Sequence, residues 1–184
     1  VTSMRFGADP EVTFEHDGKS RVASARLIIG ADGRTSTVRE PAGIVLDQDR
    51  PHHLFAGMLV EDVQGWDEKV QAIGTEGDFA FLAFPQGNGK VRVYGSFELE
   101  ARRRFAGPDG PQRFLDAFRS NSAPSNRHIA EGRPAGPVLT FFNNSTWADR
   151  PFAEGVVLVG DAAGCTDPII GMGLSLTYRD VRIV

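Results

Sequence analysis

The sequence is poor in cysteine and in long apolar runs, and each shortage excludes a class of protein. A single cysteine, Cys165, excludes an internal disulfide framework and a zinc site built from cysteines. No apolar run approaches the roughly 18 residues that a transmembrane helix needs. We therefore expect a protein of the reducing cytoplasm that has no membrane partner.

Lysine is also scarce, since only Lys19, Lys69 and Lys90 occur, and the charge balance is slightly acidic. Twenty basic residues against 24 acidic residues give a net charge of −4, and the arginines are scattered rather than gathered in a stripe. This balance argues against nucleic acid as a partner. The neighbouring histidines, His52 and His53, would point to opposite faces of a strand, so we expect no metal site.

What the sequence does contain predicts an α/β protein in three stretches. Hydrophobic residues make up 41% and charged residues 24% of the chain, which is long enough to bury a core. Residues 1–41 and 151–184 each carry a short buried strand followed by small residues and a helix, whereas residues 42–150 read as a mostly antiparallel sheet. The expected strands cover 11–15, 20–25, 27–29, 53–60, 78–85, 91–99, 138–142 and 155–159, and the expected helices cover 34–39, 111–120 and a last one that opens at 171–173.

Two of these strands end in the same way, with an aspartate beside glycine and other small residues. The first strand end is residues 28–33 (IIGADG) and the second is residues 158–164 (LVGDAAG). A carboxylate at the carboxyl end of a parallel strand lies where α/β proteins bind ligands, and it can accept hydrogen bonds from ribose or ribityl hydroxyls. The helix that opens near Gly171 would point free N–H groups and its positive dipole end at a phosphate or an electron-rich ring.

Both strand ends belong to longer motifs. Residues 32–39 (DGRTSTVR) resemble the D-G-x-x-S-x-x-R motif of FAD-dependent flavoprotein monooxygenases of the p-hydroxybenzoate hydroxylase type. Residues 160–173 are similar to the second motif of that family, G-D-A-A…P…G-x-G. The resemblance covers essentially the whole chain. It implies that residues 1–41 and 151–184 are portions of a Rossmann-like FAD- and NAD(P)H-binding domain, which flank a mostly antiparallel β-sheet substrate domain at residues 42–150.

The resemblance also implies a reaction and its cofactor residues. In this family NAD(P)H reduces FAD, and O₂ then forms a flavin hydroperoxide that hydroxylates a small molecule, here an apolar one, aromatic compounds included. The flavin carries this chemistry, so no catalytic side chain is implied. Asp161 would bind the ribityl chain, Arg39 suits a phosphate, and the backbone of 171–174 would face the flavin. The full set of implied cofactor-binding residues is Asp32, Gly33, Arg39, Gly160, Asp161, Ala162, Pro168, Gly171, Met172, Gly173 and Leu174.

Two departures from the family pattern leave the reaction open. Gly164 stands where many members have a histidine, and Met172 stands where many have a glutamine. Such variants also occur among halogenases and reductases of the same superfamily. An FAD-dependent reductase or halogenase therefore remains an alternative, as does a non-catalytic substrate-binding module. The family's N-terminal G-x-G-x-x-G does not occur in these 184 residues, so we expect the chain to be a piece without tight FAD binding or activity of its own.

Phe79 and Phe81 are the candidate residues of a substrate pocket. If the sheet face that carries them looks towards the flavin, they would line an apolar substrate site. The other interpretation, which we favour because a half-buried sheet needs such residues, places both side chains in the core. Cys165, in the loop near the expected flavin, is interpreted as a small buried thiol.

Overall fold

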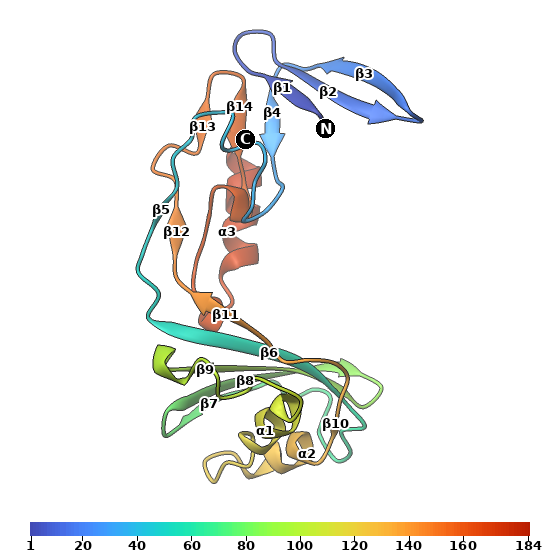
Figure 1. Ribbon diagram of the computed structural model, residues 1–184, viewed down its shortest axis with the longest axis vertical. Coiled ribbons are helices and arrows are strands. Elements are labelled where there is room, and N and C mark those ends of the chain that lie inside the picture. The colour runs from blue at the N-terminus through green and yellow to red at the C-terminus, as the bar shows by residue number, and fades with distance from the viewer. The chain divides into compact units, whose positions relative to one another are not determined.

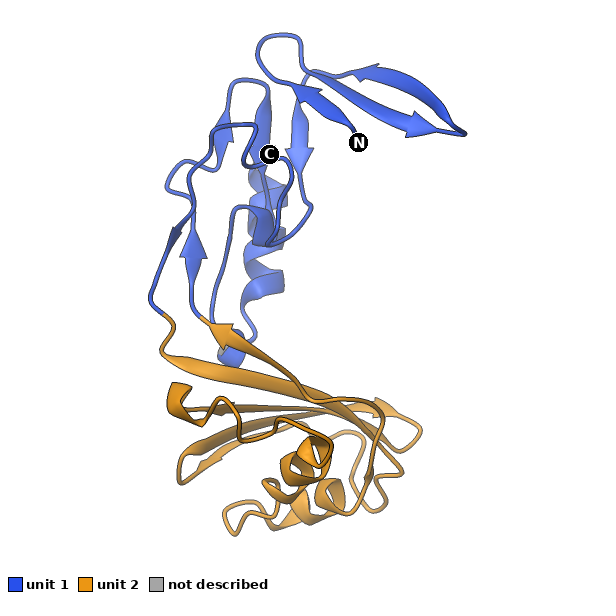
Figure 2. Ribbon diagram, in the orientation of Figure 1, with its two compact units in different colours: residues 1–50, 144–184 blue, residues 51–143 orange. Residues whose placement is uncertain are grey.

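The computed structural model describes residues 1–184, except for the side chain of Ile170, and the chain forms two compact units. The first unit contains residues 1–50 and 144–184, and the second contains residues 51–143 (Figure 2). The chain thus leaves the first unit once, builds the second unit and returns. That residues 1–41 and 151–184 bind the cofactor, and that residues 42–150 bind the substrate, stays a prediction.

Three small sheets and one long helix make up the first unit (Figure 1). Its N-terminal hairpin turns at Asp17 and Gly18, whose φ angles of 51° and 68° are those of the type I′ turn that the Asp-Gly pair favours. No helix among the described residues is long and apolar enough to span a membrane. The elements of this unit are β1 (Ser3–Arg5), β2 (Glu11–His16), β3 (Lys19–Ser24), β4 (Ile28–Gly30), β5 (Asp47–Gln48), β12 (Thr146–Trp147), β13 (Phe152–Ala153), β14 (Val156–Leu158), β15 (Gly164–Cys165), α3 (Gly173–Ile183) and 3₁₀ turns at Gly160–Ala162 and Pro168–Ile170.

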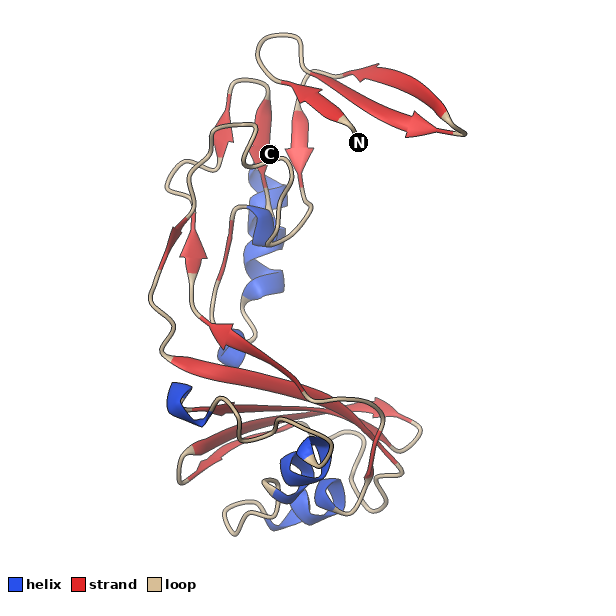
Figure 3. Cartoon of the chain, in the orientation of Figure 1, coloured by secondary structure: helices blue, strands red, loops and turns tan.

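The second unit is an antiparallel sheet with helices on one face (Figure 3). The strand order is β10-β6-β9-β8-β7, and β11 also pairs with β6. The predicted α/β class with a mostly antiparallel sheet is therefore confirmed. The elements are β6 (His53–Glu61), β7 (Ala72–Glu76), β8 (Phe79–Gly87), β9 (Lys90–Phe97), α1 (Gly110–Asp116), α2 (Arg127–Ala130), β10 (Arg133–Pro134), β11 (Leu139–Asn143) and 3₁₀ turns at Leu99–Ala101 and Pro124–Asn126.

Strict alternation of side chains decides which residues form the core of this unit. Every second residue of β6, β8 and β9 packs against the helices, because successive side chains of a strand point to opposite faces. The rings of Phe79, Phe114 and Phe118 meet at centroid distances between 5.5 and 6.2 Å, in the edge-to-face arrangement that aromatic pairs prefer. Two glycines make room for the rings, since a Cβ at Gly95 would lie 2.3 Å from the Phe79 ring and one at Gly74 would lie 2.6 Å from the Phe81 ring.

The core therefore corrects the assignment of Phe79 and Phe81 to a substrate pocket. Their exposed fractions are 4% and 2%, and both belong to the cluster that α1 and α2 cover. The sheet needs these rings to bury the apolar sides of the helices, so the face that carries them is closed. The core interpretation of both residues is confirmed.

The helix predicted for residues 34–39 is also wrong, because the structure has a series of turns there. Short polar side chains at a helix start can bond the backbone themselves and so replace helical hydrogen bonds. Here the Asp32 carboxylate accepts the N–H groups of Thr37 and Val38, and the Ser36 hydroxyl accepts that of Arg39. By contrast, the predicted last helix exists as α3, and the strands expected at 53–60, 78–85, 91–99 and 138–142 are confirmed as β6, β8, β9 and β11.

The aromatic core predicts a large cost for truncating its central ring. Phe114→Ala removes a fully buried ring between the sheet and α1, and we expect it to lower the free energy of unfolding by about 3–5 kcal/mol. Phe142→Ala is the matched control, because Phe142 is 56% exposed and its truncation should change the free energy of unfolding little. Urea unfolding followed by circular dichroism measures both, and equal losses would contradict this account of the core.

Candidate functional site

The parallel pairing of β4 with β14 brings the two aspartate-bearing strand ends together. Gly30 lies opposite Leu158 in this register, and the N–H of Val159 donates to the carbonyl of Gly30 over 3.0 Å. A Cβ at Gly30 would lie 2.6 Å from Leu158 Cδ2, so a glycine is what permits this packing. Because both strands run the same way, the segments with Asp32 and Asp161 leave the same edge of the sheet.

Asp32 organises its own segment. Its Oδ2 atom accepts hydrogen bonds from Thr37 N at 2.6 Å, Thr37 Oγ1 at 3.0 Å and Val38 N at 3.2 Å. Desolvation by the surrounding atoms raises the pKa of Asp32, but the hydrogen bonds from Ser36 and Thr37 outweigh it and leave the pKa below its ordinary value. The carboxylate thus acts within the chain, as the acceptor that closes the loop after β4.

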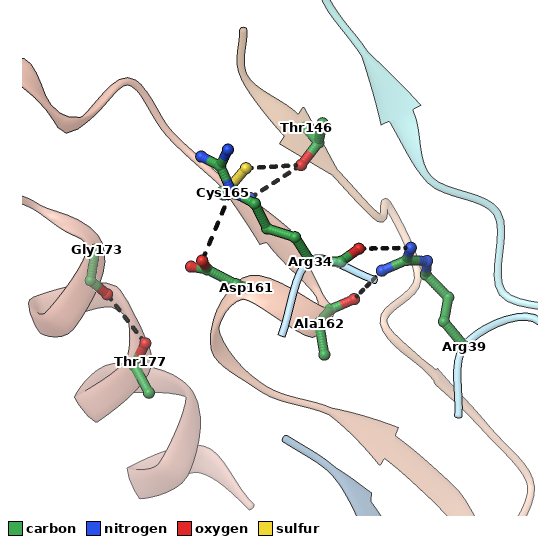
Figure 4. A network of polar contacts seen from close by, with 8 residues as sticks. All are labelled: Arg34, Arg39, Thr146, Asp161, Ala162, Cys165, Gly173 and Thr177. Carbon is green, nitrogen blue, oxygen red and sulfur yellow. Dashed lines mark hydrogen bonds and ion pairs between the residues drawn. The ribbon is translucent and has the colours of Figure 1, made fainter. Parts of the chain in front are cut away.

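Arg39 joins the two motifs through a single guanidinium group, as Figure 4 shows. Its Nη1 donates to the carbonyl oxygen of Ala162 at 2.9 Å, and its Nη2 donates to that of Arg34 at 3.0 Å. Ala162 is fully buried and Arg39 is half-buried. The planar fork of an arginine suits such paired acceptors, so Arg39 fixes the distance between the segments that follow β4 and β14.

Asp161 differs from Asp32 in that its carboxylate is open to solvent. It lies in the 3₁₀ turn Gly160–Ala162 with 49% of its side chain exposed, and its Oδ2 is 3.8 Å from Nε of Arg34, which is 47% exposed. Arg34 is the site residue that the sequence motifs did not single out. The available signal was its charge, because Arg34 is the one charged residue between Asp32 and Arg39.

The loop from Asp161 to α3 presents bare backbone. Asp167 Oδ1 accepts Ile169 N at 2.9 Å, and Gly171 N donates to Pro168 O at 3.0 Å, which forms a tight turn at Pro168–Ile170. Gly171 then adopts a φ of 65°, which a glycine adopts without strain. Apart from chain neighbours, no atom lies within 4 Å of the position that a Cβ would take at Gly171 or Gly173. The first turn of α3, whose N–H groups have no acceptor within the helix, therefore begins next to glycines that leave the backbone accessible.

Helix α3 is tied to the turn that carries Asp161. Asp180 Oδ2 accepts the N–H of Gly160 at 3.1 Å, and the Thr177 hydroxyl donates to the Gly173 carbonyl at 3.0 Å. Gly160 has a φ of 59°, and a Cβ there would lie 2.9 Å from Thr177 Oγ1. Nearby, Thr146 Oγ1 contacts the sulfur of Cys165 at 3.2 Å, and the thiol is 7% exposed, which confirms its interpretation as buried.

These residues fit a ligand with hydroxyl groups and an anionic portion. The open Asp161 carboxylate can accept from hydroxyls, the Arg34 guanidinium can pair with an anion, and the bare backbone at Gly33, Gly171 and Gly173 leaves room for a close approach. The ribityl and phosphate groups of FAD have this chemistry. Among the residues that the structure describes, no group of three or more His, Cys, Asp or Glu side chains could hold a metal ion.

The second unit carries a separate aromatic face, on the side of the sheet opposite α1 and α2. Phe55 contacts Phe141 at a centroid distance of 5.6 Å and Tyr94 at 5.5 Å, and Phe84 lies 6.1 Å from Tyr94. We call Phe55, Phe84, Tyr94 and Phe141 the aromatic face; Phe141 is 40% exposed. A Cβ at Gly57 would lie 2.8 Å from the Tyr94 ring, so this glycine lets the ring lie flat on the sheet.

A family model and several curated relatives match this chain. A sequence model described as FAD binding domain matches residues 3–184. Ubiquinone hydroxylase UbiL of Rhodospirillum rubrum is 28% identical over 200 residues, covering 100% of this chain and 41% of the relative. Kynurenine 3-monooxygenase of Salinispora tropica is 26% identical over 190 residues, covering 91% and 39%. Digeranylgeranylglycerophospholipid reductase 2 of Methanothermobacter thermautotrophicus is 26% identical over 188 residues, covering 98% and 45%.

Solved structures agree on the fold. The flavin-dependent halogenase CmlS superposes with a TM-score of 0.73 at 18% sequence identity, covering 97% of this chain and 33% of that chain. At this identity the likeness concerns the fold alone. The chain spans about two fifths of the length of the curated relatives it matches.

The bridging role of Arg39 predicts a loss of stability when the bridge is removed. Arg39→Gln cannot reach both carbonyls, and we expect it to lower the free energy of unfolding by about 1–3 kcal/mol, chiefly because the carbonyl of the buried Ala162 loses a charged donor. Arg21→Gln, on the exposed strand β3, is the matched control and should leave stability unchanged. Urea unfolding measures both variants, and an Arg39→Gln variant as stable as the parent protein would show that the bridge does not hold the two segments.

The lowered pKa of Asp32 predicts a pH-dependent contribution to stability. Because the folded pKa lies below the unfolded one, this contribution is fully present above the ordinary aspartate range, near pH 4, and is lost as the pH falls through the folded value. Asp32→Asn should therefore be less stable than the parent at pH 7, with the difference shrinking below about pH 3. Unfolding midpoints at both pH values test this against the exposed control Asp9→Asn, and a difference that is constant with pH would contradict it.

Proposed function

The chain belongs to the FAD binding domain family, and from this premise we propose that it is part of an FAD- and NAD(P)H-dependent monooxygenase that hydroxylates an apolar small molecule with O₂. The observation that carries the proposal is the pairing of β4 with β14, which joins both predicted FAD motifs at one sheet edge. Relatives that are named hydroxylase and monooxygenase support the reaction class. The cytoplasm remains the predicted compartment, supported by the single cysteine.

In this proposal the first unit holds the cofactor. Asp161 accepts hydrogen bonds from the ribityl hydroxyls, and the backbone from Gly171 to Leu174 lies against the ring, where the N-terminal dipole of α3 stabilises negative charge. Asp32, Gly33 and Arg39 shape the loop beside them. When bound and reduced by NAD(P)H, FAD supplies the chemistry that activates O₂. The side chains of this chain bind and orient it.

We further propose that the aromatic face of the second unit binds the substrate. It replaces Phe79 and Phe81, whose side of the sheet is closed by α1 and α2. Phe141 and Tyr94 offer ring surfaces to an apolar, aromatic molecule, and Phe55 supports both rings from below.

A reductase or halogenase of the same superfamily is the second candidate function. It is supported by Gly164 and Met172, which occur among reductases and halogenases of the superfamily, and by the digeranylgeranylglycerophospholipid reductase among the similar proteins. The two candidates differ in the fate of oxygen. A hydroxylase places one atom of O₂ in its product, whereas a reductase or halogenase does not.

Oxygen labelling of the full-length protein separates these functions. The purified protein should contain FAD, oxidise NADH or NADPH faster when an aromatic substrate is present, and place one ¹⁸O atom from labelled O₂ in the product. Reduction of the substrate, or its halogenation in the presence of halide, with no label incorporated would identify the second candidate. A protein that takes up no FAD would contradict both.

The aromatic face can be tested by two neighbouring phenylalanines that lie on opposite faces of β11. Phe141→Ala should raise KM for an aromatic substrate about tenfold, the size expected for a lost apolar contact, with an unchanged FAD content. Phe142→Ala is the control, since Phe142 is also exposed but pairs with Leu54 on the helix-covered face. Steady-state kinetics measure both, and equal effects of the two substitutions would place the substrate elsewhere.

A further inference from the structure

The three charged residues of the first motif have different partners in the structure. Asp32 closes its own loop, and Arg39 donates to the carbonyls of Arg34 and Ala162. Only Arg34 extends an exposed guanidinium towards the second motif, where it meets Asp161 (Figure 4). The sequence motif alone marks Arg39 as the arginine that suits a phosphate, but the structure commits Arg39 to the backbone.

The contact between Arg34 and Asp161 is one that a ligand can replace. Nε and Oδ2 are 3.8 Å apart, which is longer than a hydrogen bond, and both side chains are about half exposed. Exposed ion pairs of this kind contribute little, because water screens them and each long side chain loses freedom. The Arg39 bonds, at 2.9 and 3.0 Å, are shorter and one of them reaches a fully buried residue.

Covalent chemistry links the two ligand groups that this pair would meet. In FAD the diphosphate is attached to the end of the ribityl chain, only a few covalent bonds from the ribityl hydroxyls. A ligand whose ribityl hydroxyls bind Asp161 therefore brings its negative charge close to that carboxylate. Two anions at such a distance repel each other unless a cation lies between them. Arg34 is the cation that the structure places beside Asp161.

We propose that Arg34 binds the diphosphate of a dinucleotide cofactor by exchanging the carboxylate of Asp161 for a phosphate oxygen, whereas Arg39 only positions the two motifs. This inference rests on the proposed function, because it takes the first unit as the cofactor-binding part. When the guanidinium moves to the diphosphate, which carries two negative charges, the Asp161 carboxylate becomes free to accept hydrogen bonds from the ribityl hydroxyls. The exchange replaces one ion pair by another, and no covalent bond forms or breaks.

Riboflavin and FAD distinguish this role from a structural one, since both contain the ribityl chain and only FAD contains the diphosphate. Isothermal titration calorimetry on the apo form of the full-length protein measures both affinities. Arg34→Gln should weaken FAD binding about tenfold or more and change riboflavin binding by less than about twofold. Arg34→Lys, which keeps the charge without the fork, should lose less. The exposed Arg21→Gln is the matched control and should bind both ligands as the parent does.

A second arm shows whether Arg34 acts directly on the ligand. In an Asp161→Asn background Arg34→Gln should still weaken FAD binding by a similar factor, because its phosphate contact does not need the carboxylate. Raising the salt concentration should weaken FAD binding more in the parent than in Arg34→Gln. If the effect of Arg34→Gln vanishes in the Asp161→Asn background, Arg34 only neutralises Asp161, and the proposal is wrong.

NADPH titrated in parallel identifies the source of the diphosphate. A selective loss of FAD affinity assigns Arg34 to FAD, and a selective loss of NADPH affinity assigns it to the reductant; either result supports the proposal. Unchanged affinities for both dinucleotides, or equal losses for FAD and riboflavin, would overturn it. A parent protein that binds neither flavin would instead overturn the proposed function, and the inference would fall with it.

Discussion

The parallel pairing of β4 with β14 is the constraint on which the candidate site depends. The two strands are far apart in sequence, and their pairing makes the segments after Gly30 and Leu158 leave the same sheet edge. Arg39 adds a second tie, by bonding across 123 positions of the chain to the carbonyl of Ala162. Glycine at position 30 permits the close packing that the pairing needs. Loss of this pairing would separate the two motifs, and no single side chain could restore the site.

Two aspartates at equivalent strand ends have different roles because their surroundings differ. Asp32 accepts three hydrogen bonds within its own loop, which lowers its pKa and commits its carboxylate to the fold. Asp161 has an exposed carboxylate and one long contact to Arg34, so it remains available to a ligand. The same division separates Arg39, which holds backbone carbonyls, from Arg34. Within the first motif, Asp32 and Arg39 thus hold the fold, whereas Arg34 is available to a ligand.

The sequence predicted the strands of the second unit well, because alternating apolar residues reveal a half-buried strand. The same alternation does not show which face the helices cover, so it leaves Phe79 and Phe81 as candidates for a pocket although α1 and α2 pack on their side of the sheet. The helix expected at 34–39 failed because side chains of Asp32 and Ser36 replace helical bonds. The contact of Arg34 with Asp161 joins two distant segments, and a single sequence contains no signal for such a pair.

Hydrogen–deuterium exchange of the full-length protein with and without FAD tests the central claim most directly. The account predicts that FAD slows amide exchange in residues 32–34, 160–164 and 171–174, which surround the paired strand ends, while the hairpin at residues 16–19 exchanges as before. FAD-dependent protection that is absent from these three segments and present elsewhere in the chain would contradict the claim that the β4 and β14 strand ends form the cofactor site.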